Sequence, residues 1–296
     1  MGDIYTYSFV IPHHNSPQLL ERCLHSIPMR DDLEIIVVDD NSSEEYKPVI
    51  ARPDVKLITI GPDETEGAGK ARNVGLKEAQ GKWILFADCD DFYKDGFLNV
   101  LDKYKDTDLD VLYFNAEIRN SDTLTLASYS LGLTKYIAKY QKDKTALTDI
   151  RYCHNPWNKM VKHELIARFD IQFEAILNGN DIFYSFLVGY FAKKIEVNDQ
   201  VLYVYTLNSQ SITHKRKTEA AKLCVLQNRY KIKEFYKFIG YKKLSSFILS
   251  YWKDVLRKKG ICPFVDMMLL YLKHRDEIKR LSFFYVQEIE RRKSLI

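Results

Sequence analysis

Three carboxylates stand within four residues at the end of an apolar run. The run 84–87 ends at Asp88, and Asp90 and Asp91 follow after one cysteine. Alternate residues of an extended segment point the same way, so Asp88 and Asp90 can share one cation. Hard oxygen ligands suit Mg²⁺ or Mn²⁺, and these ions suit a diphosphate. The alternative is a solvated turn in which Asp91 caps a following helix.

Two other polar clusters also follow strand-like runs. The run 7–11 is apolar and rich in β-forming residues, and we expect Pro12 to stop it before the polar residues 13–15. A second buried strand is predicted over 33–38, and paired aspartates that include Asp40 end it. A carboxylate there could accept hydrogen bonds from a nucleotide base or from ribose hydroxyls. It could equally form an Asx turn or a helix cap.

A glycine-rich turn opens a predicted helix over 67–79. It follows the third predicted strand (55–60), so it is not the fingerprint of a dinucleotide fold, and it lacks the Gly-Lys-Ser/Thr of a P-loop. Its glycines allow a close backbone approach, and Arg72 could pair with a phosphate. Alternatively, Arg72 ties the helix to Asp40 or Asp88.

The order of these elements predicts an α/β fold. Helical patterns at 17–27 and 67–79 separate strand patterns at 7–11, 33–38, 55–60 and 82–87. Strands joined by helical crossovers form a mostly parallel sheet flanked by helices, and ligands bind beyond the carboxyl ends of its strands. All three polar clusters lie at such ends. Further strands at 110–115 and 195–205, a helix over 181–192 and C-terminal helices broken near Gly240 and Gly260 are also predicted.

The composition is that of an ordinary globular protein. Of the 296 residues, 46% are hydrophobic and 28% are charged. The five cysteines form no CxxC pair, which fits a reducing cytoplasm better than a disulfide framework. No signal peptide or apolar stretch long enough to span a membrane is evident. We therefore expect a cytoplasmic protein.

The charge is unevenly distributed. Residues 215–296 hold 21 Lys and Arg against 8 Asp and Glu, a net +13, whereas the other 214 residues hold 23 against 32, a net −9. Aromatic and basic residues alternate over 229–243, and ordinary helical packing accounts for many of these aromatics. The excess positive charge fits an anionic membrane surface, which suggests a peripheral location at the inner membrane face. The acidic body argues against nucleic acid as a partner.

In order along the chain, these motifs resemble glycosyltransferase family 2, whose catalytic domain has the GT-A fold. FVIPHHN, IIVVDDNSSE and GAGKARNVGLKEAQGKWILFADCDD are similar to the nucleotide-binding motifs of the family. NPWNKMVKHELI, NGNDIFYSFLVGYFAKKIEV and SQSIT are similar to its later motifs. The resemblance covers about residues 5–214 and implies a GT-A type sheet.

The resemblance implies which residues hold the donor and the metal. The residues expected around the nucleotide and its diphosphate are Pro12, His14, Asn15, Asp40, Arg72 and Asp88. Mn²⁺ or Mg²⁺ would be bound directly by Asp90 and shared with Asp88, and Asp91 would support it.

The resemblance also implies residues for the acceptor side. Asp181 would be the general base, and its place in the first turn of a helix predicts a low pKa, because a helix N-terminus favours the ionised carboxylate. Trp157 is a candidate for stacking on an acceptor sugar, with core packing as its alternative. His214 is a candidate for closing over the diphosphate, with a solvated loop as its alternative.

The resemblance implies a catalytic domain over 1–214, with a nucleotide-sugar half to about 108 and an acceptor half from about 109, and then a basic helical region over 215–296. The implied activity is metal-dependent, inverting transfer from a nucleotide-sugar, most simply a UDP-sugar, to a glycan or lipid-linked acceptor in surface polysaccharide synthesis. A sugar nucleotidyltransferase and a non-catalytic nucleotide-sugar-binding subunit are the alternatives. The oligomeric state is left open.

Overall fold

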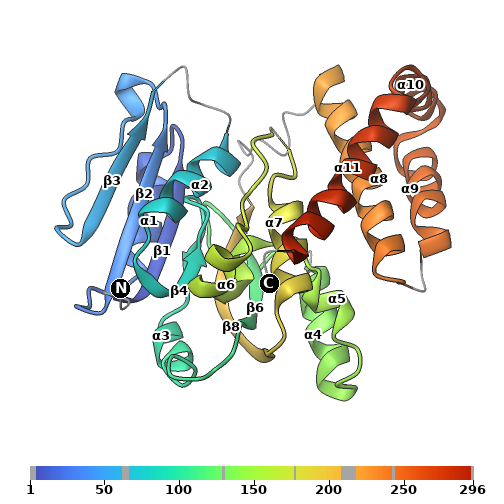
Figure 1. Ribbon diagram of the computed structural model, residues 1–296. Coiled ribbons are helices and arrows are strands. Elements are labelled where there is room, and N and C mark those ends of the chain that lie inside the picture. The colour runs from blue at the N-terminus through green and yellow to red at the C-terminus, as the bar shows by residue number, and fades with distance from the viewer. Residues whose placement is uncertain are drawn as a thin grey trace. The chain divides into compact units, whose positions relative to one another are not determined.

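The structure is a computed structural model that describes residues 5–61, 67–128, 131–176, 178–207, 218–241 and 244–294. The chain divides into two compact units (Figure 1). The first comprises residues 1–176 and 180–211, and the second comprises 177–179 and 212–296. The predicted boundary after residue 214 lies outside the described residues and stays a prediction.

The first unit is built on one eight-stranded sheet. Its strands are β1 (Tyr5–His13), β2 (Leu33–Asp40), β3 (Val55–Ile60), β4 (Gly81–Phe86), β5 (Phe92–Tyr93), β6 (Val111–Asn120), β7 (Lys159–Lys162) and β8 (Ile195–Leu207). Their order is β3-β2-β1-β4-β7-β6-β8-β5. The four N-terminal strands pair in parallel, as predicted. The sheet as a whole is mixed, because β7 runs antiparallel to both of its neighbours and β5 runs antiparallel to β8.

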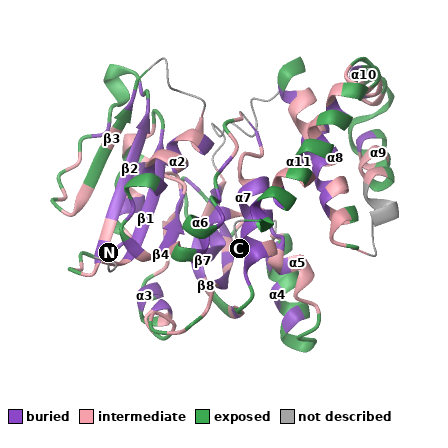
Figure 2. Ribbon diagram, in the orientation of Figure 1, coloured by how far each residue is buried: buried purple, intermediate pink, exposed green. Residues whose placement is uncertain are grey.

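Helices and short turns connect these strands. The first unit contains α1 (Pro17–His25), the 3-10 turn η1 (Glu44–Tyr46), α2 (Ala68–Glu78), α3 (Phe97–Leu101), α4 (Gly132–Lys142), α5 (Thr148–Arg151), the 3-10 turn η3 (Pro156–Asn158), α6 (His163–Arg168) and α7 (Asp181–Phe191). The central strands are buried along most of their length (Figure 2). At Gly75 of α2 an added Cβ would lie 2.4 Å from Val10, so the glycine allows the helix to pack closely on β1.

Pro12 does not end the first strand, contrary to expectation. β1 continues to His13, and Pro12 pairs in register with Val38 of β2. On its other side the pairing of β1 with β4 stops at Val10. Pro12 therefore lies where only one neighbouring strand continues, and a proline is tolerated where a ladder hydrogen bond is not needed.

The second unit consists of α8 (Glu219–Phe238), α9 (Leu244–Lys259), α10 (Ile261–Lys273) and α11 (Arg275–Lys293). Breaks at Gly240 and Gly260 confirm the prediction, and both glycines have positive φ, of 68° and 90°. One buried hydrophobic cluster of this unit is formed by Leu226, Tyr230, Val255, Met267, Leu270 and Ile278. Across the described residues, no helix is both long and apolar enough to cross a bilayer.

Candidate active site

The ends of β1 and β2 are joined by a buried polar network. His13 accepts from the Ser16 backbone N–H through Nε2, at 3.1 Å, so its Nδ1 carries the proton and donates to Asp39 at 2.8 Å. Burial lowers the pKa of His13, which keeps the ring neutral. Ser42 donates to the same Asp39 oxygen at 2.5 Å. His13 and Asp39 therefore hold the corner between the strands together.

Beside this corner His14 and Asn15 are exposed, whereas Asp40 is buried. The His14 ring bonds through Nδ1 to the Asp40 carbonyl at 2.7 Å, and Asn15 Oδ1 accepts from the Ser43 backbone N–H at 2.9 Å. Asp40 is 8% exposed, and its Oδ1 has no hydrogen-bond partner among the described residues. Burial raises the pKa of Asp40. A buried acceptor without a partner suits a donor group on a ligand, such as a base N–H or a ribose hydroxyl.

Helix α2 brings Arg72 between two parts of the chain that are distant in sequence. Gly67 precedes the helix with a φ of 84°, and an added Cβ on Gly69 would lie 2.2 Å from the Glu174 carbonyl oxygen. The glycines thus permit close approach to the protein's own backbone. Arg72, 5% exposed, donates to Asp88 at 2.5 Å and to Asn180 Oδ1 at 2.9 Å. The expectation that Arg72 ties the helix to an acidic neighbour is confirmed for Asp88.

The turn after β4 carries Asp88 and Asp90. Arg22 donates to the Asp90 carbonyl at 2.5 Å, and Thr206 Oγ1 donates to the same oxygen at 2.6 Å. Burial, and then the charge of Asp88, raise the pKa of Asp90 to about 6. Because α1 and β8 hold its backbone, the turn keeps its shape while its carboxylates repel each other. Nothing in the sequence pattern marks Arg22 or Thr206 for this purpose, since they lie 68 and 116 residues from Asp90.

Asp91 does not suit the metal-supporting role expected of it. It is fully buried, and its two oxygens accept from the Tyr203 hydroxyl at 2.9 Å and from the Thr206 backbone N–H at 2.7 Å. Burial raises its pKa well above the usual range. It does not cap a helix either, because β5 follows it directly. Its hydrogen bonds instead tie the turn to β8.

The remaining carboxylates suit a divalent cation that is also bound by a substrate. No group of three or more His, Cys, Asp or Glu side chains among the described residues could hold a metal by itself. Mg²⁺, however, is commonly bound by one or two carboxylates together with substrate phosphates. Asp88 and Asp90 supply two such carboxylates, and the pKa of Asp90 is raised by burial and by the charge of Asp88, so a bound cation would relieve the repulsion between them. The residues therefore fit Mn²⁺ or Mg²⁺ bound together with a diphosphate.

Asp181 is the first residue of α7, as predicted, but its pKa is not low. Burial raises it, and this effect outweighs the opposing charge of Arg72 and the helix terminus. The expectation of a low pKa is wrong, because the protein around the first turn of α7 removes part of the water from the Asp181 carboxylate, which stays partly exposed. A carboxylate with a raised pKa is a stronger proton acceptor, which suits a general base.

Lys159 at the start of β7 is a buried charge that the motif analysis did not single out. It is 1% exposed and donates to Ser185 Oγ and to the Cys153 carbonyl, both at 3.1 Å. Ser185 lies one helical turn beyond Asp181 on α7. Burial lowers the pKa of Lys159, whereas Asp181 acts to raise it. The cation therefore both holds the first turns of α7 and favours an ionised Asp181.

The sequence model described as Glycosyl transferase family 2 matches residues 8–168, which is more than half of the chain. The chain belongs to glycosyltransferase family 2. The match includes the ends of β1, β2 and β4 and all of α2, so it covers Asp40, Arg72, Asp88 and Asp90 of the site described above.

Individual relatives are distant. The uncharacterized glycosyltransferase EpsJ of Bacillus subtilis is 26% identical over 215 residues, which is 70% of this chain and 62% of that protein. The GalNAc(5)-diNAcBac-PP-undecaprenol beta-1,3-glucosyltransferase of Campylobacter jejuni is 31% identical over 142 residues, 46% of each chain. These matches span less than two thirds of the relatives' length.

A solved structure shares the fold. The crystal structure of S. aureus TarS 1–349 in complex with UDP-GlcNAc is 20% identical, with a TM-score of 0.55, and the likeness covers 98% of this chain and 90% of that chain. The predicted GT-A type α/β fold, with helices flanking the sheet and further helices at the C-terminus, is confirmed.

In this family 2 protein, the two candidates for contacts with an acceptor or a closing loop are not confirmed. Trp157 is 3% exposed and stacks on Tyr203 with ring centroids 4.8 Å apart. The side chain is part of the core, so it is not available to stack on a sugar, and the core-packing alternative is correct. His214 and the SQSIT stretch lie outside the described residues.

Proposed function

We propose that this chain transfers a sugar, with inversion, from a UDP-sugar to a hydroxyl group of a glycan or lipid-linked acceptor. Arg72 carries the proposal, because it joins Asp88 of the strand-end turn to Asn180 beside Asp181. Hydrogen bonds of Arg72 thereby connect the turn that carries Asp88, proposed to bind the donor, to the residue before Asp181, the candidate base. The two substrate classes are supported by the TarS complex, which contains UDP-GlcNAc, and by the Campylobacter relative, whose name includes PP-undecaprenol.

The donor would lie beyond the carboxyl ends of β1, β2 and β4. The unpaired Oδ1 of Asp40 is an acceptor for the nucleoside, and His14 and Asn15 border the same edge. Mn²⁺ or Mg²⁺ on Asp88 and Asp90 would supply positive charge to the diphosphate leaving group. Arg72 adds a fixed cation at the same turn.

In the transfer step Asp181 takes the proton of the acceptor hydroxyl while that oxygen attacks the anomeric carbon from the face opposite the diphosphate. The bond from the anomeric carbon to the diphosphate oxygen breaks, and its electron pair leaves with UDP. Asp181 must be ionised for this step, and Lys159 favours that state. The net charge of +13 over residues 215–296 suggests that the reaction takes place at the inner membrane face.

The proposal is tested by measuring UDP release from a panel of UDP-sugars with Mn²⁺, first without acceptor and then with lipid-linked acceptors. We expect slow hydrolysis of one donor and faster release with an acceptor. Asp181→Asn should lower turnover by roughly 10²–10⁴ while donor binding is kept. Tight UDP binding without any release of UDP from the UDP-sugars would instead identify a non-catalytic binding subunit. Near-normal transfer by the Asp181→Asn variant would show that Asp181 is not the general base.

A further inference from the structure

Helix α10 of the second unit has two apolar faces. On its inner face Met267 and Leu270 belong to the buried core. Its other large aliphatic side chains are exposed, at 71%, 45%, 61% and 57% for Ile261, Val265, Leu269 and Leu272. Spacings of four, four and three residues place these four side chains on one stripe of the helix. A helix that only covered a core would carry polar residues there.

Several aromatic and basic residues of α8, by contrast, pack inside the second unit. Phe235 is fully buried, and Tyr230 stacks on Tyr271 with ring centroids 5.0 Å apart. Lys231 is 7% exposed and lies over the Tyr285 ring. The sequence pattern over 229–243 therefore does not identify the outer surface. Of the fifteen exposed large hydrophobic side chains among the described residues, eight lie between 244 and 294.

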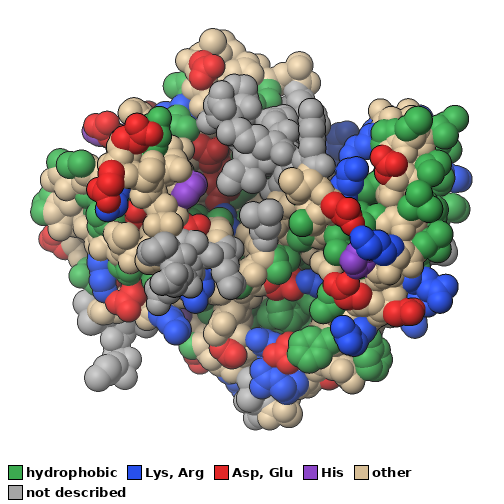
Figure 3. All heavy atoms as spheres, turned by 90° about the horizontal axis from the view of Figure 1, so that it is seen from above, with side chains coloured by type: hydrophobic (Ala, Val, Ile, Leu, Met, Phe, Trp, Pro, Cys, Tyr) green, Lys and Arg blue, Asp and Glu red, His purple; other side chains and the backbone are tan. Residues whose placement is uncertain are grey.

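Positive charge stands at one end of the stripe. Helix α9 ends with the exposed residues Arg257, Lys258 and Lys259, directly before Gly260 and Ile261. Residues 244–273 contain five Lys and Arg against two Asp and Glu, a net +3. In the space-filling view, hydrophobic side chains gather along the edge formed by α9 and α10, with Lys and Arg side chains among them (Figure 3).

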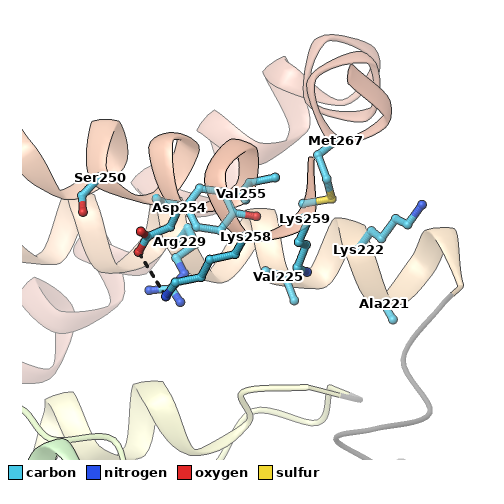
Figure 4. Close-up of a pocket in the computed structure, with 11 residues that line it drawn as sticks. Ala221, Lys222, Val225, Arg229, Ser250, Asp254, Val255, Lys258, Lys259 and Met267 are labelled. Carbon is cyan, nitrogen blue, oxygen red and sulfur yellow. Dashed lines mark ion pairs between the residues drawn. The ribbon is translucent and has the colours of Figure 1, made fainter. Parts of the chain in front are cut away.

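The two terminal lysines of α9 also line a groove between α8 and α9, with a volume of about 400 Å³ (Figure 4). Lys222 and Arg229 of α8 line it as well. Asp254 is the acidic lining residue, and it lies 3.8 Å from Lys258. Apolar residues that line it include Val225, Val255 and Met267. Four cationic side chains against one carboxylate suit an anionic group such as a phosphate.

We propose that the α10 face, defined as the stripe Ile261, Val265, Leu269 and Leu272 together with Lys258 and Lys259, docks on an anionic lipid bilayer. The groove then receives the phosphate of a lipid headgroup. Apolar side chains bordered by lysines are the pattern of a helix that lies in a membrane interface. A second copy of the chain would bring the same positive charge against itself, which disfavours a symmetric dimer through this face. The inference rests on the proposed function and deepens it by naming the surface through which the protein meets the membrane.

The test is sedimentation of the full-length protein with phosphatidylcholine vesicles that contain or lack phosphatidylglycerol, at low and high salt. We expect binding to the anionic vesicles at low salt only. Replacing Ile261, Val265, Leu269 and Leu272 by Ser should weaken this binding by about tenfold or more, as should Lys258→Glu with Lys259→Glu. Matched controls are Val49→Ser with Leu126→Ser, at residues 94% and 65% exposed, and Lys135→Glu with Lys142→Glu on exposed positions of α4. The control variants should bind like the original protein.

Far-UV circular dichroism shows whether the helical second unit of each variant is folded. Calorimetric UDP binding, which does not depend on the vesicles, separates this inference from the proposed transfer activity. Binding of the original protein and the α10 variants to anionic vesicles with equal affinity would overturn the proposal. So would a lower oligomeric state of the serine variant in analytical ultracentrifugation, which would make the stripe an interface between copies. Inorganic phosphate that binds as tightly as a short-chain phosphatidylglycerol would make the groove a site for free anions.

Discussion

Arg72 donates to Asp88 at 2.5 Å from a position in which only 5% of the arginine is exposed. The same guanidinium reaches Asn180 with its other nitrogen. Arg72→Lys keeps the charge but not the planar fork that contacts both partners. We expect UDP affinity with Mn²⁺ to fall by about tenfold, measured by calorimetry. The exposed Arg168→Lys serves as control, and unchanged affinity of the Arg72 variant would show that the bridge does not order the donor site.

Asp90→Asn tests the metal assignment. The substitution removes a carboxylate whose pKa is raised to about 6, so the metal-free protein should unfold at the same or a higher temperature. Mn²⁺-dependent enhancement of UDP binding should nevertheless be lost. Asp91→Asn is the contrasting variant. Because Asp91 is fully buried and ties the turn to β8, its replacement should lower the free energy of unfolding by about 1–3 kcal/mol. Unaltered Mn²⁺ dependence in Asp90→Asn would refute the assignment.

The metal-free protein should lose stability as the pH rises. A carboxyl group whose pKa is raised on folding, like that of Asp90 from 3.8 to about 6, is destabilising once it is ionised, so its cost develops between these values and persists above them. The pKa values of Asp40 and Asp181 are raised in the same direction. The lowered pKa of His13 offsets part of this change, because a buried neutral imidazole gains stability as the pH rises toward about 6.5. With three carboxyl groups of raised pKa against it, the melting temperature should still be higher at about pH 5 than at about pH 7.5. Mn²⁺ should narrow this difference, and a melting temperature that rises over the range would contradict the interpretation.

Lys159 should contribute, after burial and Arg72, to the pH dependence of transfer. The base must be ionised, so turnover falls as the pH drops through the pKa of Asp181, and the charge of Lys159 lowers that pKa. Lys159→Met should therefore move the acid limb of the pH–rate profile to higher pH. Ser185→Ala removes the hydrogen bond between α7 and Lys159 but leaves the charge, so its profile should keep the original position. Identical profiles for the two variants would show that Lys159 acts only through packing.

Trp157 should behave as a core residue. It stacks on Tyr203 and Tyr205 with ring centroids 4.8 and 5.8 Å apart. Trp157→Ala should lower the free energy of unfolding by about 3–5 kcal/mol, measured in urea. Trp157→Phe should recover much of that stability and leave KM for the acceptor unchanged. A stable Phe variant with a strongly raised acceptor KM would restore the sugar-stacking role.

The sequence by itself determined the parallel core and the edge on which the site lies. The apolar runs at 7–11, 33–38 and 82–87 are short and rich in β-forming residues, which favours buried strands, and the crossovers between them bring their polar ends to one edge. His13, Asp40 and Asp88 meet there for that reason. The ordered motifs also identified the family, which the match over 8–168 confirmed.

Only the tertiary structure decided what burial does to individual side chains. Asp181 lies at a helix N-terminus, as its local sequence predicts, yet its pKa is raised because distant elements remove water from it. Asp91 and Trp157 look like ligands in their motifs, but β8, more than a hundred residues from Asp91 and about fifty from Trp157, contacts both of them. The sequence also could not predict that the stripe of α10 is exposed. Apolar periodicity shows that a helix has an apolar face, but it does not show whether another element covers that face.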